Sequence, residues 1–212
     1  MDSSFNLAVH ALVCLSHSGR SLSSEALAEN ICTNPTRVRR VLAGLKTANL
    51  FACRFSDGDA LRRCLCCWNR RLTKKGLRIL PLRFEGRRAL IYVYRPARLA
   101  CDLRQAAACR LLEERGYPVG GSSERCIIRL MERLHGGGGF PDEIGLFLGY
   151  PPEDVRGFIE NKAAGCKCVG CWKVYGDAEA ARAVFAKYKK CTDVYRARFA
   201  EGRSVERLTV AG

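Results

Sequence analysis

The sequence predicts an α+β protein, with a three-helix helix-turn-helix unit at the N-terminus and then a helix-rich domain with a small antiparallel sheet. Helical spacing of apolar residues recurs along most of the 212 residues. Two β-rich runs, LRILPLRF and RRALIYVY, flank Glu85-Gly86, a combination typical of a β-hairpin. Apolar residues make up 48% of the chain and charged residues 27%, which are values of a globular protein and not of a disordered one.

Three short helices are expected before residue 50. The first runs from about Ser4 to His17, with apolar residues at helical spacing. The second lies in the run SSEALAENI, where Ser23 is a good N-cap. Asn34 can cap the third, with Pro35 at its first position, where a missing N–H costs nothing. About 50 residues bury little surface, so this unit is expected to depend on the rest of the chain for its stability.

The third helix has the features of a DNA-reading helix. Its apolar residues share one face by helical spacing: Val38, Val41, Leu42 and Leu45. The opposite face and its flanks hold Thr36, Arg37, Arg39, Arg40, Ala43 and Thr47. A helix that packs by one side and offers Thr and Arg on the other suits the major groove of DNA. An ordinary helical hairpin with a solvated basic face has the same spacing, and this alternative stays open.

Residues 5–45, FNLAVHALVCLSHSGRSLSSEALAENICTNPTRVRRVLAGL, resemble the start of the Rrf-type winged-helix transcriptional repressors. The resemblance implies that Thr36, Arg37 and Arg40 face double-stranded DNA, and we add Arg39, which lies between them. The wing and the long dimerisation helix of that family are not recognisable after Leu50. Its iron–sulfur members carry three widely spaced cysteines, whereas the cysteines at 64, 66 and 67 are crowded, so no cluster carries over.

The remaining elements are expected in a fixed order. A helical stretch from Asp59 ends at Gly76, with basic residues in its last turns. The hairpin comes next, and Pro81 predicts an edge position for its first strand, while Arg95-Pro96 ends its second. The later elements are helices at about 97–115 and 122–135, the short helices PDEIGLFLG and PEDVRGFIEN, a strand at CKCVGCWKVY, a long helix over about 178–202 and a short tail helix.

A second resemblance covers residues 42–210. Its most specific run is FPDEIGLFLGYPPEDVRGFIENK followed by CWKVYGD, and it is similar to a bacterial family known as domain of unknown function 3793. The family supplies no activity to carry over. The two resemblances meet at VLAGLKTANL, which predicts two domains, 1–45 and 46–212, joined as a fusion at about residues 40–50. The alternative is that a foreign fragment replaced the original N-terminus of the larger domain.

The net charge is +15, from 36 Lys and Arg against 21 Asp and Glu. Residues 51–100 are the most basic part, with thirteen Lys and Arg against three acidic residues. Such a segment suits a polyanion such as nucleic acid, through phosphate contacts that carry no sequence information. An arginine-rich composition on solvated faces would give the same count.

The cysteines indicate a reducing compartment. Thirteen is an odd number and no secretion signal frames the apolar run Leu7–Leu15, which is also far shorter than the roughly 20 residues of a membrane span. We therefore expect a cytoplasmic chain without a membrane partner. The cluster Cys166, Cys168 and Cys171 would need Cys191, on a later helix, to complete a zinc site. We expect half-buried thiols there, no metal and no cofactor.

No catalytic constellation is recognisable. The three histidines, His10, His17 and His135, have no partner spacing for a nucleophile and base. The glycine run 136–139 lacks the Lys-Ser/Thr and the preceding strand of a phosphate-binding loop. An enzyme is therefore the less expected class, and no catalytic residue is assigned.

Five residues are candidates for binding a small ligand: Glu143, Tyr150, Asp154, Trp172 and Tyr175. The two carboxylates lie near helix starts, where their interaction with the helix dipole is a sufficient explanation for them. The alternative, that they form a metal-binding or general-base pair, stays open. The aromatic residues suit either a core or a stacked ligand. The preferred function is a DNA-binding, regulator-like protein of undefined oligomeric state. The alternative is a small-ligand binding module or an enzyme of unknown reaction in the larger domain.

Overall fold

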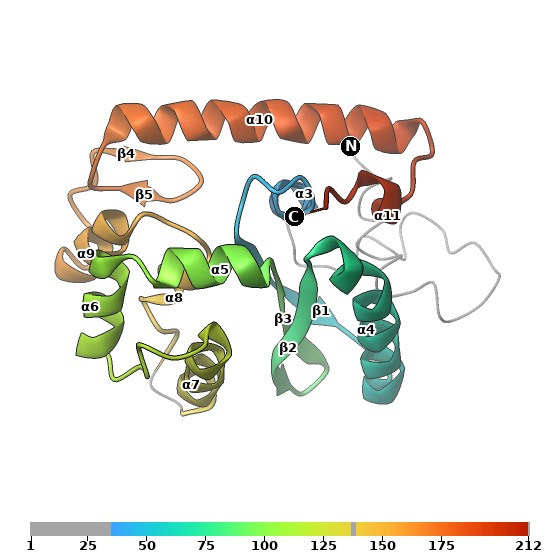
Figure 1. Cartoon of the computed structure of the whole chain (residues 1–212), viewed down its shortest axis with the longest axis horizontal. Coiled ribbons are helices and arrows are strands. Elements are labelled where there is room, and N and C mark those ends of the chain that lie inside the picture. The colour runs from blue at the N-terminus through green and yellow to red at the C-terminus, as the bar shows by residue number, and fades with distance from the viewer. Residues whose placement is uncertain (1–34, 137–138, 212) are drawn as a thin grey trace. The chain divides into compact units, whose positions relative to one another are not determined.

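The computed structural model describes residues 35–136 and 139–211 (Figure 1). The first two expected helices, and with them most of the predicted helix-turn-helix unit, lie outside the described residues. The chain divides into two compact units. We call the described residues 35–95 and 191–211 the sheet unit, and the described residues of 96–190 the helical unit. Helices outnumber strands and the main sheet is small and antiparallel, so the predicted α+β class is confirmed.

The sheet unit is built around three antiparallel strands. In chain order its elements are α3 (Pro35–Leu42), β1 (Ala48–Arg54), α4 (Gly58–Leu72), the 3-10 turn η1 (Thr73–Lys75), β2 (Arg78–Glu85), β3 (Arg88–Tyr94), the end of α10 (Ala178–Ala200) and α11 (Val205–Leu208). The strand order is β1-β3-β2.

The predicted hairpin is confirmed as β2 and β3. Glu85 pairs with Arg88 across a turn in which Gly86 has a φ of 54°, a left-handed conformation that glycine adopts without strain. Pro81 lies in β2, an edge strand of the sheet as expected, beside a register shift between Pro81 and Arg83. The sequence does not predict strand β1, because the run ANLFACR mixes weak strand formers with only two large apolar side chains.

Helix α4 and η1 together confirm the helical stretch expected to end at Gly76. The Asp57 carboxylate caps the start of α4 by accepting from the N–H groups of Asp59 and Ala60 at 2.8 and 3.1 Å. Gly76 closes the far end at a φ of 70°. One face of α4 is buried in the core, through Leu61, Leu65, Trp68 and Leu72 among others.

Helix α3 is shorter than its apolar spacing predicts. Gly44 has a φ of 71°, its N–H donates to Val41 O, and the N–H of Leu45 donates to Arg40 O at 2.9 Å. This pair of bonds is a Schellman motif, which ends the helix. Leu45 is consequently 39% exposed and Thr47 is buried, so their expected places on the buried and exposed faces are wrong.

One core joins α3 to the sheet. Val38, Val41 and Leu42 pack with strand residues such as Phe51 and Ile91 in a single buried cluster. The predicted domain boundary at residue 45 therefore falls between two elements, α3 and β1, that contribute to the same core.

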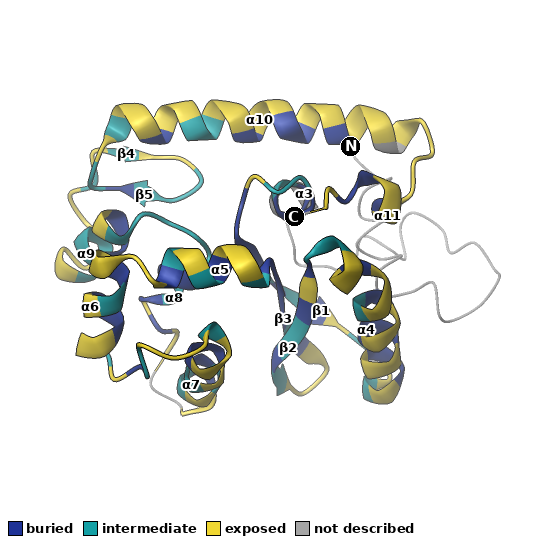
Figure 2. Cartoon of the chain, viewed as in Figure 1, coloured by how far each residue is buried: buried dark blue, intermediate teal, exposed yellow. Residues whose placement is uncertain are grey.

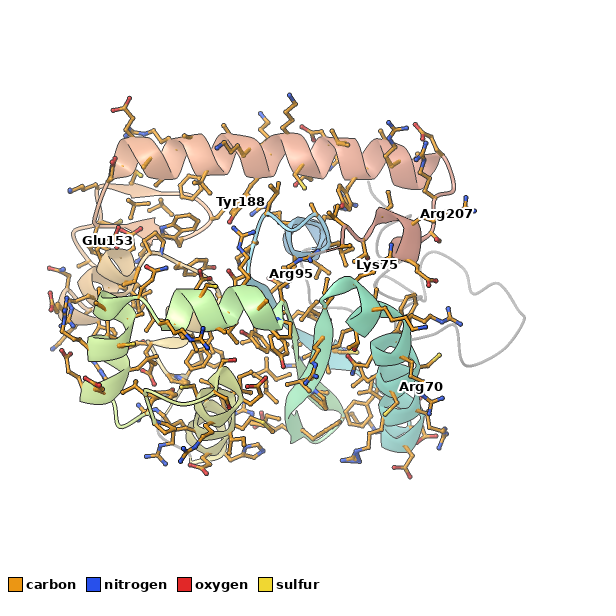
Figure 3. The ribbon with its side chains drawn as sticks, viewed as in Figure 1. Arg70, Lys75, Arg95, Glu153, Tyr188 and Arg207 are labelled. Atoms are coloured by element: carbon orange, nitrogen blue, oxygen red, sulfur yellow. The ribbon has the colours of Figure 1, made fainter. Side chains whose placement is uncertain are left out.

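Arg95 fastens three parts of the sheet unit to one another (Figure 3). Its buried guanidinium donates to Val41 O at 2.8 Å, to Leu42 O at 2.9 Å and to Val210 O at 2.7 Å. The first two are carbonyls at the end of α3, and the third belongs to the C-terminal tail. The N–H of Val210 donates back to Leu42 O at 3.0 Å, which completes the attachment of the tail.

The helical unit contains α5 (Pro96–Leu103), α6 (Ala106–Glu114), α7 (Ser123–His135), α8 (Ile144–Phe147), α9 (Pro152–Glu160), β4 (Cys168–Val169), β5 (Lys173–Val174) and most of α10. The helix expected over 97–115 is two helices, because Gln105 adopts an extended ψ of 134° between them. The strand expected at CKCVGCWKVY is instead a hairpin of two-residue strands around Gly170. Each helix of this unit turns a buried side inward (Figure 2). Among the described residues, no helix is both long and apolar enough to cross a membrane.

Candidate functional site: an aromatic pocket in the helical unit

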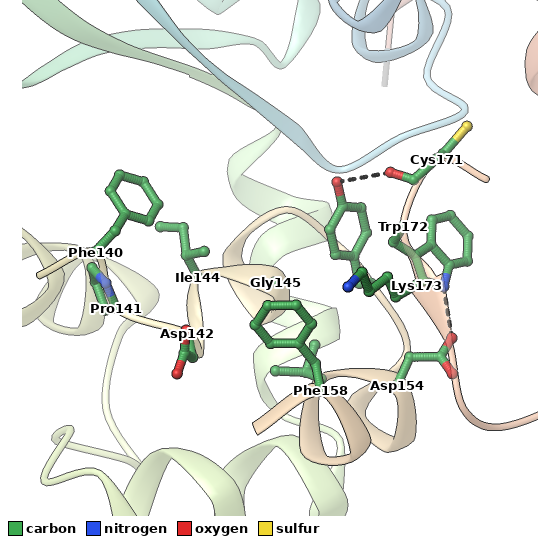
Figure 4. Close-up of a pocket in the computed structure, with 12 residues that line it drawn as sticks. Phe140, Pro141, Asp142, Ile144, Gly145, Asp154, Phe158, Cys171, Trp172 and Lys173 are labelled. Atoms are coloured by element: carbon green, nitrogen blue, oxygen red, sulfur yellow. Dashed lines mark hydrogen bonds between the residues drawn. The ribbon is translucent and has the colours of Figure 1, made fainter. Parts of the chain in front are cut away.

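Three of the five predicted ligand residues, Tyr150, Asp154 and Trp172, line one pocket of about 260 Å³ (Figure 4). The segment before α8, the first turns of α9 and the turn before β5 enclose it. The other lining residues are Phe140, Pro141, Asp142, Ile144, Gly145, Val155, Phe158, Cys171 and Lys173. Separate runs of the sequence, within 140–158 and 171–173, thus meet in one concave site.

Tyr150 and Trp172 form an aromatic wall of this pocket. Their rings are stacked, with centroids 5.1 Å apart and an angle of 27° between the planes. The Tyr150 hydroxyl donates to the carbonyl of Cys171 at 3.4 Å. On Trp172 a second ring, that of Phe185 in α10, packs edge-on at 4.6 Å. The indole is held between two aromatic neighbours.

Asp154 holds the wall in place from α9. Its Oδ2 accepts from the Trp172 indole N–H at 2.6 Å, and its Oδ1 accepts from the N–H groups of Tyr175 and Gly176, each at 2.7 Å. The side chain is buried, so three donors replace the water that its charge loses. The structure thus gives Asp154 a positioning role that is more specific than complementing the helix dipole.

Two glycines are required by the close packing around this wall. A Cβ on Gly145 would lie 2.7 Å from Val155, which lines the pocket, and 3.2 Å from the Tyr150 ring. A Cβ on Gly170 would lie 2.1 Å from the Phe185 ring. Neither contact is sterically allowed, so both positions need glycine for the aromatic residues to lie where they do.

Glu143 lies behind the pocket and not in it. It is fully buried, and its Oε1 accepts from the Tyr117 hydroxyl at 2.8 Å and lies 2.8 Å from Arg133 Nε. Its Oε2 is buried without a hydrogen-bond partner. Burial and the hydrogen bond to Glu143 raise the pKa of Tyr117 well above its usual value. The arrangement is a buried anion with one cation and one hydroxyl as partners, which fixes the start of α8.

Tyr175, the fifth candidate, also lies outside the pocket lining. A Cβ on Gly157 would lie 2.5 Å from Cβ and Cγ of Tyr175, so this side chain packs closely against the backbone of α9. Burial raises the pKa of Tyr175, and its hydroxyl is buried without a hydrogen-bond partner.

The sequence alone does not point to the pocket's other side chains. Phe140 is 53% exposed at its edge, and Phe158 lies one helical turn beyond Asp154 on α9. The Lys173 ammonium donates to the carbonyl of Ala163 at 2.6 Å, so Lys173 closes the loop after α9. The spacing of Asp154 and Phe158, four residues apart on one helix, is the signal that could have identified Phe158.

The residues expected to face DNA differ in how far they are buried. Thr36 and Arg37 belong to α3, but their side chains lie outside the described ones. Arg40 is half-buried, and Arg39 is only 2% exposed. Burial raises the pKa of the Cys191 thiol in α10, and the positive charges of Arg40 and Arg39 oppose that rise. Arg39 in this arrangement faces the protein and not a DNA groove.

Within the described residues, no three His, Cys, Asp or Glu side chains are arranged to hold a metal ion. Cys166, Cys168 and Cys171 are half-buried cysteines outside any disulfide, around the β4–β5 hairpin.

Comparison with known proteins gives one match. The model of a family described as "Protein of unknown function (DUF3793)" matches residues 36–209. No curated protein and no solved structure matches the chain. The match begins within α3, so α3 and the sheet fall inside one family domain, and it supplies no activity.

Proposed function

We propose a small-molecule-binding function for this chain, which belongs to the DUF3793 family of proteins of unknown function. The site is the aromatic pocket of the helical unit. The ligand class is a planar, mostly apolar molecule of one or two rings, because the pocket of about 260 Å³ is at the small end for ligand sites.

One observation carries the proposal: the stacked Tyr150–Trp172 wall is fixed in place before any ligand arrives. Asp154 holds the indole at 2.6 Å and Phe185 supports its edge, so little side-chain freedom is lost on binding. Besides Asp154, whose carboxylate is occupied by the wall, the lining carries Asp142 and Lys173, which favours a ligand with polar groups on a ring over a plain hydrocarbon. The described residues of the lining include no histidine, and for that reason we propose binding and not catalysis.

The fluorescence of Trp172 can be used to measure ligand binding. The chain has two tryptophans, and Trp68 is buried in α4 of the sheet unit, so Trp68→Phe leaves Trp172 as the only indole. We expect at least one compound of a panel of one- and two-ring heteroaromatic molecules to change its emission saturably. Tyr150→Ala should then weaken binding at least tenfold, while Phe84→Ala, a half-buried aromatic change in the sheet unit, should not. No saturable change with any compound contradicts the proposal, as does equal binding by Tyr150→Ala.

A second candidate is a DNA-binding, regulator-like function through α3. One observation favours it: Arg40 on α3 is only half-buried, so part of its side chain is exposed, and the chain as a whole is strongly basic. If α3 reads bases, Arg40→Ala should cost about 1–3 kcal/mol on a preferred site selected from genomic fragments, and less on other sequences. An equal loss on all sequences would reduce Arg40 to a phosphate contact. We further propose that the protein works in the cytoplasm, because none of the eleven described cysteines forms a disulfide.

A further inference from the structure

Helix α4 presents a basic face to solvent that neither the pocket nor α3 uses. Its exposed residues recur at helical spacing and form one row, which we call the α4 stripe: Arg62, Arg63, Cys66, Cys67, Arg70, Arg71 and, in η1, Lys74. After Asp59 the stripe contains no acidic residue. Figure 2 shows the outward side of α4 as exposed, and in Figure 3 the labelled Arg70 points away from the helix.

The charges of the stripe are weakly compensated. At its start, Arg62 lies 3.9 Å from Asp59 and Arg63 lies 3.7 Å from Asp57, and all four side chains are at least half exposed. Such long, solvated pairs contribute little and exchange readily for another anion. In the described part of the chain, Arg70 and Lys74 form no ion pair.

The stripe lies on a rigid support. The opposite face of α4 is buried in the core, and the side chain of Asn69 exchanges two hydrogen bonds with the backbone of Ile79 in β2, at 2.8 and 2.9 Å. The Arg71 guanidinium lies 5.7 Å from the Trp68 ring centroid. The position of the arginines is therefore set by the fold and not by a flexible loop.

We propose that the α4 stripe binds double-stranded DNA through its phosphates. Arg70 and Arg71 lie eight positions after Arg62 and Arg63, an offset of about 12 Å along a helix. The major groove of B-DNA is also about 12 Å wide, so the two pairs can reach the phosphates on both rims while α4 lies across the groove. Arginine suits this role because its planar fork donates to two phosphate oxygens at once.

The neighbouring hairpin end adds to the same surface. The Arg62 guanidinium lies 4.6 Å from the Phe84 ring, which brings the start of α4 beside the end of β2. Exposed arginines follow at the β2–β3 turn, at positions 87 and 88, and Arg54 pairs opposite Arg88 at the end of β1. In the described ranges 35–95 and 191–211, twenty Lys and Arg face six Asp and Glu, so the surrounding field also attracts a polyanion.

An acidic membrane surface is the competing partner, and the packing of α4 disfavours it. A helix that lies in a membrane interface inserts an apolar face, and the apolar face of α4 is already buried in the core. The exposed stripe offers only Cys66 and Cys67 between its charges.

Matched charge reversals in the full chain test the proposal. Arg70→Glu with Arg71→Glu changes the net charge by the same amount as Lys187→Glu with Lys190→Glu, a pair of exposed lysines in α10. With a labelled 20-base-pair duplex, measured by fluorescence anisotropy at two salt concentrations, we expect the α4 variant to lose at least tenfold in affinity and to show a shallower salt slope. The α10 variant should lose less than threefold. Equal losses overturn the proposal, because net charge alone would then explain binding, and circular dichroism confirms that both variants are folded.

The cysteines of the stripe provide an independent footprint. Cys66 and Cys67 are exposed in its middle, and Cys101 in α5 is an exposed thiol of the helical unit. We expect bound duplex to slow alkylation of Cys66 and Cys67 at least fivefold, measured by mass spectrometry, and to leave Cys101 unchanged. Protection by anionic phospholipid vesicles without protection by duplex overturns the proposal in favour of a membrane surface. Uniform slowing of all three thiols overturns it as well.

Discussion

The two units of this protein differ most in their balance of basic and acidic residues. In the described residues of the sheet unit, Lys and Arg outnumber Asp and Glu by fourteen, whereas in the helical unit fifteen basic residues face twelve acidic ones. The helical unit pairs its surface charges, for example Arg156 with Glu114 at 3.0 Å, which lowers the pKa of Glu114. An excess of charges of one sign opposes folding, because the charges repel one another. The excess of positive charge in the sheet unit is therefore a reason to propose a DNA partner for that unit, whereas the proposal for the helical unit rests on its pocket.

Each unit contains a buried charged side chain that holds neighbouring segments together, and the two charges are of opposite sign. Arg95 in the sheet unit donates to carbonyl groups at the end of α3 and in the tail, whereas Asp154 in the helical unit accepts from an indole and two backbone N–H groups. Both satisfy backbone groups that no regular ladder pairs. Removing either side chain should lower the free energy of unfolding. The two losses should differ in size, because the groups left unpaired differ in number and burial.

The largest effect is expected for Arg95→Ala. It removes four charge-assisted hydrogen bonds and leaves the carbonyls of Val41, Leu42, Val210 and Lys75 without this donor, which should cost about 4 kcal/mol. Urea unfolding followed by circular dichroism measures it. Arg78→Ala, an exposed arginine of β2, is the control and should stay within about 0.5 kcal/mol of the parent. A loss below about 1 kcal/mol for Arg95→Ala would mean that the tail and α3 do not depend on this guanidinium.

Asp154→Ala should cost about 3 kcal/mol, because three donors lose one buried acceptor group. In the Trp68→Phe background the same change should also shift the Trp172 emission to longer wavelength, since the indole loses its partner. Asp142→Ala, at an exposed carboxylate of the same pocket, controls for the loss of a negative charge. An unshifted emission in Asp154→Ala would show that the wall is held by ring packing alone.

Tyr195 predicts alkaline destabilisation of the sheet unit. Burial raises its pKa to about 12, and its hydroxyl donates to Leu208 O at 2.6 Å. An unfolded tyrosine ionises near pH 10, so between about pH 10 and 12 the unfolded state loses a proton that the folded state keeps. The stabilisation of about 3 kcal/mol is complete below pH 10 and disappears as the pH rises through the folded pKa. Tyr195→Phe should flatten the pH dependence of urea midpoints in this window, and an unchanged slope contradicts the assignment.

Local sequence signals predict most elements and miss those set by tertiary contacts. The hairpin at Glu85-Gly86, the edge position of Pro81 and the end of α4 at Gly76 follow from turn and cap residues acting over a few positions. Strand β1 does not, because it is defined by pairing with β3 about forty residues later. The apolar spacing that extends α3 to Leu45 ignores Gly44, whose left-handed conformation ends the helix.

The candidate site shows the same division. Aromatic and carboxylate chemistry predicts Tyr150, Asp154 and Trp172, and they meet in one pocket only because the β4–β5 hairpin lies against α9. The same chemistry selects Glu143, but its neighbours Tyr117 and Arg133 come from other elements and bury it. Helical spacing assigns Arg39 to DNA, and spacing cannot distinguish a solvated face from one that the rest of the fold buries.

The smallest effect is expected for Lys75, which repeats the role of Arg95 nearer the surface. Its ammonium donates to the carbonyls of Glu206 and Thr209, at 2.5 and 2.9 Å, and so joins η1 to the region of α11 (Figure 3). Water can reach part of this site, because Lys75 is half-buried, so Lys75→Met should cost only about 1 kcal/mol. Lys74→Met, the exposed neighbour, should cost less than about 0.5 kcal/mol. If the two variants unfold at the same urea concentration, the tail is held by Arg95 and core packing, and donation to carbonyl groups stabilises the sheet unit only where the cation is buried.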